Sequence, residues 1–332
     1  MRIRPTLATA AAAAIAAASM AFPAAADAQQ LPALPQLPAP QAPQAPQVPA
    51  LPLPATLEPA PPVNPGVAQN YVSFGDSLAA NPTVLDIMVS RLQKRGYDIP
   101  NPNIQEGSCP QDRNAFPTRT AVQTGLRLSD YSCGGATAYV PSSANDAIPH
   151  TTFAEQVDHA LADGNLNGNT RLITVSIGVN DVYQPGNDAP VNHEYRMQRY
   201  QEVVSAQLQR VKAAAPNARI IMVGLPDQTD GANHTCATNL LGVVSHWYFP
   251  IVSFYQDEVR TQQRDAASTV NATYLDMVEE INLARGNNGC SADSNRLSAA
   301  VFDDAPHRFT FHLTDAGHGY YANRITDVYH AS

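Results

Sequence analysis

The chain has 332 residues, a formal net charge of −9 and no extended cluster of lysine or arginine. Nucleic acids and anionic lipid surfaces attract basic patches, so this composition argues against both as electrostatic partners. The length is sufficient for one large folded domain in addition to the N-terminal segments described next.

The first 28 residues are typical of a secretory signal peptide. Arg2 and Arg4 precede an apolar, alanine-rich run from Leu7 to Phe22, and residues 26–28 form a small-x-small cleavage site. The apolar run is short for a membrane span. We therefore expect a protein that is secreted or associated with the cell envelope after removal of this peptide.

Residues 29–66 hold thirteen of the 28 prolines, interleaved with Ala, Gln and Leu. Such a composition cannot build a packed core and favours an extended, disordered linker. The linker is expected to act as a tether, with attachment to the cell envelope as an open alternative. The folded domain is then expected over residues 67–332.

Strand-like and amphipathic helical runs alternate along this domain. In the first half of the domain we expect a strand at 71–74, a helix at 85–92, a polar insertion at 101–127, a helix at 152–161 and a strand at 172–177. A helix at 193–215 and a strand at 219–225 should follow, and then a helix within 243–264 that is broken or begins near Pro250. The chain should end with a strand at 270–275, a second polar insertion at 282–308 and a closing helix at 315–329. This alternation predicts an α/β fold, a three-layer α/β/α sandwich with a central parallel sheet.

Polar residues follow several of the expected strands. Ser77 follows the first strand in Gly75-Asp76-Ser77-Leu78, Asn180 follows the strand that ends at Ile177, and Asp315 and His318 open the closing helix. Ligands of such sheets bind beyond the carboxyl ends of the strands. The sequence therefore predicts a site at this edge.

The residue types fit nucleophilic hydrolysis of an ester. Ser77 is the candidate nucleophile and His318 the candidate base. Asp315 lies three residues before His318, on the same helical face, where it can orient the imidazole. The Ser77 N–H, a glycine of the pair Gly134-Gly135 and the Asn180 amide are candidate oxyanion donors.

Each residue also has a structural interpretation. Gly75-Asp76-Ser77 can be an ordinary turn, Asp315 a helix N-terminal acid and His318 a solvated surface histidine. Asp303 or Asp304 can replace Asp315 as the acid. The cluster His307, His312 and His318 tempts a metal assignment, but its ligand set is poor. The aromatic segment from Ser245 to Phe249 can line an acyl pocket, but core packing is expected for most of it. Phe309 and Phe311 are also expected in the core.

The four cysteines, Cys109, Cys133, Cys236 and Cys290, suggest two disulfides in an exported chain, and three connectivities are possible. We favour Cys109–Cys133 and Cys236–Cys290, because each bridge would attach one insertion to the next framework segment.

Four blocks, Gly75-Asp76-Ser77-Leu78, Gly134-Gly135, Gly178-Val179-Asn180-Asp181 and Asp315-Ala316-Gly317-His318, resemble in order and spacing those of the SGNH (GDSL) hydrolases, in particular the secreted actinobacterial lipase/esterase-like branch. The resemblance implies a flavodoxin-like fold. It also implies Ser77 as nucleophile, His318 as base, Asp315 as acid and Asn180 as an oxyanion donor. Gly135 is the implied glycine donor, with Gly134 as the alternative, and the branch's disulfides support the pairing above.

The resulting expectation is a secreted serine ester hydrolase, a lipase or esterase that forms an acyl-enzyme on Ser77. We expect no cofactor and no metal, a small-molecule or lipid ester as substrate, no nucleic-acid partner and a monomer. The alternatives are a carbohydrate acetyl or acyl esterase acting on envelope or plant polysaccharide, and a non-catalytic envelope-binding protein.

Overall fold

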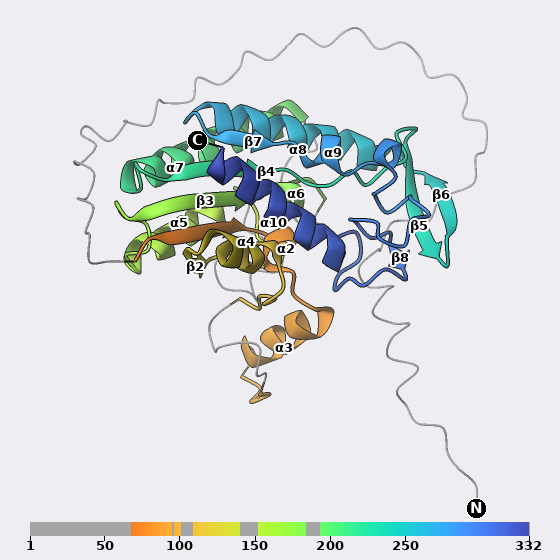
Figure 1. Cartoon of the computed structure of the whole chain (residues 1–332), viewed down its shortest axis with the longest axis horizontal. Coiled ribbons are helices and arrows are strands. Elements are labelled where there is room, and N and C mark those ends of the chain that lie inside the picture. The colour runs from red at the N-terminus through yellow and green to blue at the C-terminus, as the bar shows by residue number, and fades with distance from the viewer. Residues whose placement is uncertain (1–67, 95, 101–108, 140–151, 184–192, 332) are drawn as a thin grey trace, which may run out of the picture. The chain divides into compact units, whose positions relative to one another are not determined.

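The structure is a computed structural model that describes residues 68–331 except 95, 101–108, 140–151 and 184–192 (Figure 1). The expected signal peptide and proline-rich linker lie outside the described residues.

A five-stranded parallel sheet forms the centre of the domain. Its strands are β1 (Asn70–Gly75), β2 (Arg127–Asp130), β3 (Thr170–Ser176), β4 (Arg219–Val223) and β7 (Thr273–Leu275), in the order β2-β1-β3-β4-β7. Strands β1 and β3 are buried along nearly their whole length, as the runs of β-branched and aromatic residues require. This strand order is that of flavodoxin-like folds.

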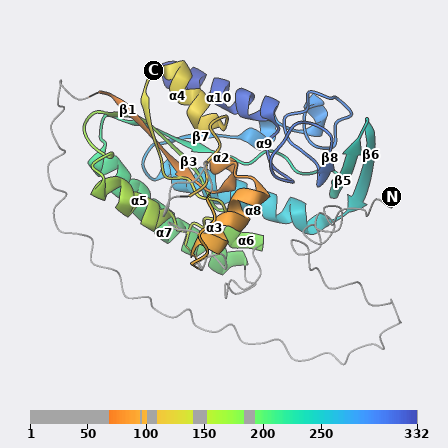
Figure 2. The same ribbon diagram turned by 90° about the horizontal axis from the view of Figure 1, so that it is seen from below.

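Helices cover both faces of the sheet, as Figure 2 shows edge-on. The main helices are α3 (Val84–Lys94), α4 (Phe116–Thr124), α5 (Phe153–Ala162), α7 (His193–Ala214), α8 (Pro250–Ser268) and α10 (Asp315–His330). Alternate residues of β1 point to opposite faces: Phe74 packs with Phe153 of α5 and Tyr200 of α7, whereas Tyr71 packs with Phe116 of α4 and Tyr321 of α10. The predicted three-layer sandwich is confirmed.

Short helices follow three of the central strands directly. They are α2 (Ser77–Ala80) after β1, α6 (Val179–Tyr183) after β3 and α9 (Met277–Glu280) after β7, and a 3₁₀ turn, η1 (Leu283–Arg285), comes next. The residues that begin α2 and α6 therefore lie at the carboxyl edge of the sheet.

The structure corrects two expectations about secondary structure. Helix α4 lies inside the first expected insertion and buries Phe116 against α10. The run before Pro250 is not helical: β5 (His234–Leu240) and β6 (Val243–Tyr248) form an antiparallel hairpin, which β8 (Phe302–Asp303) extends to a second sheet. Helix α8 does begin at Pro250, because proline is suited to the first turn of a helix.

Both expected disulfides are confirmed. Cys109 and Cys133 are bonded with their Cα atoms 5.2 Å apart, and Cys236 and Cys290 with theirs 5.3 Å apart. The second bridge fastens β5 to the loop before β8. None of the helices in the described part of the chain combines the length and the apolar character needed to cross a bilayer.

Candidate active site

Ser77 is held rigidly where β1 turns into α2. The Gln156 side chain accepts from Gly75 N–H (2.9 Å) and donates to the Gly75 carbonyl (2.8 Å), which fixes the end of the strand. A Cβ at Gly75 would stand 2.7 Å from the Ser176 carbonyl oxygen of β3. Glycine is needed here because the two backbones approach so closely.

Asp76 caps α2 and is buried beside Ser77. Its Oδ1 accepts from Leu78 N–H at 2.9 Å, as an N-cap side chain does. Its Oδ2 is buried and has no hydrogen-bond partner among the described residues. Burial, helped by the charge of Asp181 and opposed by the Leu78 N–H, raises the pKa of Asp76 to about 7.

His312 contacts Ser77 directly. Its Nε2 lies 2.7 Å from Ser77 Oγ, and its Nδ1 lies 2.8 Å from the Thr310 carbonyl oxygen. A carbonyl can only accept a hydrogen bond, so Nδ1 carries the proton and Nε2 presents its lone pair to the Ser77 hydroxyl. This is the tautomer that a general base requires.

The loop that carries His312 is fixed by its neighbours. Ala299 N–H donates to the His312 carbonyl (2.8 Å), and Phe311 N–H donates to the Ala300 carbonyl (3.4 Å). The Phe309 ring stands edge-on to the imidazole, with centroids 4.8 Å apart. These contacts set the ring orientation, and none of those seen in the described part of the chain involves a carboxylate.

The imidazole of His312 is neutral near neutral pH. Burial, with a smaller contribution from His307, lowers its pKa to about 4, against the opposing effect of the Thr310 carbonyl. The ring nevertheless keeps some contact with solvent. Burial disfavours the charged form, so the direction of this shift keeps the imidazole unprotonated.

The expected pairing of Ser77 with His318 is not found. His318 is buried, and its Nδ1 accepts from Phe116 N–H, 3.2 Å away at the start of α4. Ala115, the N-cap of α4, provides no side-chain hydrogen bond, so His318 serves that helix end instead. Burial, then the charge of Arg119, lowers the pKa of His318 to about 3. The ring is therefore neutral, with Nδ1 engaged at the start of α4 and Nε2 buried without a hydrogen-bond partner among the described residues.

Asp315 does not orient an imidazole. It is exposed in the first turn of α10, and His318 Nδ1 cannot donate to it because that atom is already an acceptor. The block around it has a packing role: a Cβ at Gly317 would stand 1.9 Å from the Leu297 carbonyl oxygen. The Asp-x-x-His segment therefore lies where α10 packs against α4 and the backbone at Leu297.

The alternative acids Asp303 and Asp304 are engaged elsewhere. Asp303 forms an ion pair with buried Arg296, and Asp304 Oδ1 lies 2.5 Å from the same guanidinium. The ring nitrogens of His312 bond to Thr310 and Ser77, and neither of these carboxylates takes part.

The candidate oxyanion donors lie at the same edge of the sheet as Ser77. Cys133 N–H donates to the Gly75 carbonyl (3.0 Å), which places Gly134 and Gly135 next to the end of β1. Asn180 Nδ2 donates to the Ala136 carbonyl (2.7 Å). Gly135 has a φ of +83°, a conformation that glycine adopts readily. The structure thus brings the three blocks together.

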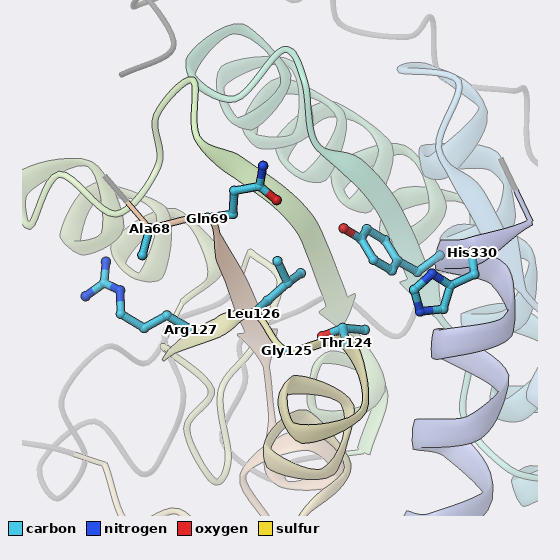
Figure 3. Close-up of a pocket in the computed structure, with 8 residues that line it drawn as sticks. Ala68, Gln69, Thr124, Gly125, Leu126, Arg127 and His330 are labelled. Carbon is cyan, nitrogen blue, oxygen red and sulfur yellow. The ribbon is translucent and has the colours of Figure 1, made fainter. Parts of the chain in front are cut away.

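Two features away from Ser77 resemble ligand sites. A hollow of about 520 Å³ lies at the amino ends of β1 and β2, lined by residues that include Gln69, Arg127 and His330 (Figure 3); this is the end of the sheet remote from Ser77. Cys236, His246 and Cys290 have metal-ligating atoms close together, but both cysteines are consumed by the disulfide.

Comparison with known proteins defines the class. The model of the GDSL-like lipase/acylhydrolase family matches residues 73–320, so the chain belongs to this family and is a carboxylic ester hydrolase. Lipase 2 of Streptomyces coelicolor is 26% identical over 250 residues, which cover 68% of this chain and 75% of that protein.

Two crystal structures are similar in outline. Phospholipase A1 from Streptomyces albidoflavus NA297 has a TM-score of 0.49 and 18% identity, and the extracellular lipase from Streptomyces rimosus has a TM-score of 0.46 and 19% identity. Each match covers 79% of this chain and 99% of the other.

Proposed function

We propose that the protein is a serine esterase or lipase in which Ser77 is the nucleophile and His312 the general base. The Ser77 hydroxyl attacks the ester carbonyl carbon while His312 Nε2 takes its proton. The proton then passes to the leaving alcohol oxygen, and the acyl group stays on Ser77. Water, deprotonated by the same nitrogen, releases the acid and restores the serine.

The observation that carries this proposal is the continuous hydrogen-bonded chain from Ser77 Oγ through His312 to the Thr310 carbonyl. The carbonyl replaces a carboxylate as the group that orients the base. It fixes the tautomer and stabilises the imidazolium through its dipole rather than a full charge. This proposal supersedes the roles expected for His318 and Asp315.

The oxyanion that forms on the carbonyl oxygen of the substrate needs hydrogen-bond donors. We assign the Ser77 N–H, the Gly135 N–H and the Asn180 amide to this role, with Gly134 as the alternative glycine. Ser77 is the first residue of α2, so its N–H has no acceptor within the helix. The Asn180–Ala136 bond supports the assignment because it aligns the amide with the glycine loop.

An acyl chain would find apolar surface on α3. Val84, Leu85 and Met88 are exposed there, and a Cβ built on Gly134 would stand 3.8 Å from Ile87 of the same helix. The helix thus begins a few residues after the nucleophile and borders the glycine loop. These side chains support a lipid-like acyl group in preference to the acetyl group of a sugar ester.

We further propose that the protein is exported. The N-terminal sequence pattern and the two disulfides support this location, because disulfides persist in oxidising compartments.

Labelling with a fluorophosphonate probe tests the catalytic assignment. Wild-type protein should react covalently, Ser77→Ala should not, and Asp315→Asn should react at a rate within about threefold of wild type. Loss of a triad's carboxylate would lower turnover by roughly four orders of magnitude, so a collapse in Asp315→Asn would restore the original assignment. Equal labelling of Ser77→Ala would remove Ser77 from the mechanism.

A substrate panel tests the ester class. Nitrophenyl esters from acetate to palmitate should show kcat/KM rising beyond the acetate, and acetylated xylan should be a poor substrate. Preference for the acetylated sugar would favour the carbohydrate esterase alternative.

A further inference from the structure

The β5–β6 hairpin exposes an unusual amount of apolar surface. Leu241 is 92% exposed, Val243 72%, Tyr248 69%, Trp247 62% and Leu240 46%. We call these five residues the apolar hairpin. The expectation that the aromatic residues of this segment belong to the core is therefore wrong. Exposed apolar side chains that gather on one element mark a contact surface.

The hairpin is also free of formal charge. The run from Gly231 to Gln256 contains no Asp, Glu, Lys or Arg, in a chain in which charged residues make up 15%. Strand β6 forms the outer edge of its sheet. Native proteins commonly protect such edges with charges, so this one is suited to an environment other than water.

The turn at the tip disfavours the residue found there. Leu241 and Gly242 join the strands in a two-residue turn with φ values of +52° and +77°. Turns with two positive φ values prefer Asn or Asp at the first position, because most side chains are strained there. Leucine at this position adds neither turn stability nor solubility.

The tip is nevertheless firmly held. Leu241 N–H donates to Asp304 Oδ2 (2.6 Å), and the charge of Asp304 is balanced by the buried guanidinium of Arg296. The backbone is thus fixed while the leucine side chain points into solvent. An apolar group that is preorganised in this way loses little entropy when it is buried by a partner.

A disulfide and backbone hydrogen bonds connect the hairpin to the loop that carries His312. The Cys236–Cys290 bond fastens β5 to the loop before β8, and Val301 N–H donates to the Cys236 carbonyl (3.4 Å). The residues just before Val301 bind Phe311 and His312. Figures 1 and 2 both show the second sheet at the end of the domain opposite the C-terminus.

We propose that the apolar hairpin inserts into an electrically neutral lipid surface and so holds the active site at an aggregate of ester substrate. Aliphatic side chains lie at the tip and Trp247 and Tyr248 at the far end of β6, as expected for a tip in the acyl region and aromatic rings near the headgroups. Protein interfaces enclose their apolar centre in a polar rim, whereas the most exposed side chains of this hairpin, at its tip, are aliphatic. The inference builds on the proposed function, since it names the physical state of the substrate.

The matched variants Leu241→Asn and Val122→Asn test the proposal. Val122 is 79% exposed on α4, which Figures 1 and 2 show away from the β5–β6 hairpin. Asparagine is favoured by the Leu241 backbone conformation and keeps the bond to Asp304, so Leu241→Asn should fold at least as stably as wild type. Any lost binding is then not a folding defect.

Binding is measured by co-sedimentation of the full chain with phosphatidylcholine vesicles, in a Ser77→Ala background that cannot hydrolyse them. We expect the parent to bind, Leu241→Asn to bind about ten- to a hundredfold more weakly, as loss of one buried leucine predicts, and Val122→Asn to match the parent. Raising the salt concentration should not weaken binding, because no ion pairs are involved.

Three outcomes would overturn the proposal: absence of vesicle binding by the parent, equal binding by Leu241→Asn, or a hairpin-dependent dimer in sedimentation velocity without vesicle binding. The last would identify a second copy as the occupant. In an active background, Leu241→Asn should hydrolyse soluble nitrophenyl butyrate at the wild-type rate. Hydrolysis by Ser77→Ala tests the catalytic assignment, whereas vesicle binding by Leu241→Asn tests the lipid contact. The two proposals can therefore fail independently.

Discussion

His312 Nε2 and Ser77 Oγ lie 2.7 Å apart, although 235 residues separate them in the chain. Ser77 is placed by the first strand of the central sheet, and His312 by a loop that is bound to the segment around Ala299 and Ala300. Two independently supported parts of the domain thus meet in one hydrogen bond. The chemistry depends on both supports.

His312 and His318 should differ in what they lose when each is replaced by asparagine: activity at His312 and stability at His318. His312→Asn should lower kcat/KM for nitrophenyl butyrate by roughly a thousandfold or more, because an amide cannot accept the proton. His318→Asn keeps an acceptor for Phe116 N–H but removes ring packing. It should therefore lower the midpoint of urea unfolding while kcat stays within about tenfold of wild type.

Circular dichroism of both variants provides the control, since His312→Asn should unfold like wild type. A collapse of activity in well-folded His318→Asn, with His312→Asn active, would return the role of base to His318.

The pH dependence should also report on His312. Because burial lowers its pKa below the ordinary 6.5, to about 4, the base stays unprotonated as pH falls through the range in which an ordinary histidine titrates. We expect kcat/KM to stay level from pH 8 to about 5.5 and to fall only below that. An acid limb centred at 6.5 or higher would contradict this environment for the ring.

Stability must be followed in the same experiment. His318 has a folded pKa below its ordinary value, so the unfolded chain binds a proton more readily as pH falls below about 6.5. The free energy of unfolding therefore decreases in that window. Activities are compared only at pH values where the circular dichroism spectrum is unchanged.

The sequence was sufficient to predict the framework and the position of Ser77 at the end of the first strand. The alternation of apolar runs predicted the parallel sheet, and Ser77 follows the first strand as expected. These features depend on local patterns, namely buried β-branched strands and a turn at their carboxyl ends. The disulfide pairing was also predicted, because each bridge attaches a loop to nearby framework.

The base that we propose, His312, could not be found by spacing. Residue 309, three positions before His312, is phenylalanine, so His312 has no Asp-x-x-His pattern, whereas Asp315 and His318 have one. The orienting group is the Thr310 carbonyl, and a main-chain atom leaves no mark in the sequence. The one available signal was position: His312 lies in a loop ahead of the Thr314 N-cap, whereas His318 lies within α10.

The hairpin was missed for a different physical reason. Val243, Val244 and Trp247 have strand propensity, but their apolar character is compatible with a buried helix when no turn signal is recognised. The turn between β5 and β6 is Leu241-Gly242 in place of a common Asn-Gly pair. Leu241, which made the turn hard to recognise in the sequence, is also the residue that we place in contact with lipid.

Replacing Asp76 with asparagine should stabilise the protein at high pH. The folded pKa of about 7 exceeds the ordinary 3.8, so between these values the folded state holds a proton that the unfolded state has lost. Stability therefore falls as pH rises through this window. Asp76→Asn has no proton to lose, and its Oδ1 can still accept from Leu78 N–H.

Urea unfolding at several pH values measures this effect. We expect Asp76→Asn to gain on the order of 1–4 kcal/mol over wild type at pH 8 and little at pH 3.5, where the carboxyl is protonated in both states. Equal unfolding free energies at both pH values, or a loss at pH 8, would show that the ionised carboxylate is favoured by its surroundings.

Asp112 should couple the nucleophile to the base without contacting either. Its Oδ2 accepts from Asn81 Nδ2 (2.8 Å), just after α2, and its Oδ1 lies 2.9 Å from the guanidinium of Arg308, four residues before His312. Asp112→Asn removes the charge that holds Arg308. Small displacements of catalytic groups cost about a hundredfold, so kcat should fall about ten- to a hundredfold with KM little changed.

Arg308→Gln should reproduce this loss, and the double variant should be no worse than either single one, because both break the same link. Fluorophosphonate labelling rates should fall in parallel with kcat, whereas a general destabilisation would lower the unfolding midpoint instead. Multiplicative losses in the double variant would show that Asp112 and Arg308 act separately. Unchanged kcat in a folded Asp112→Asn would show that the Ser77–His312 distance is set without this bridge.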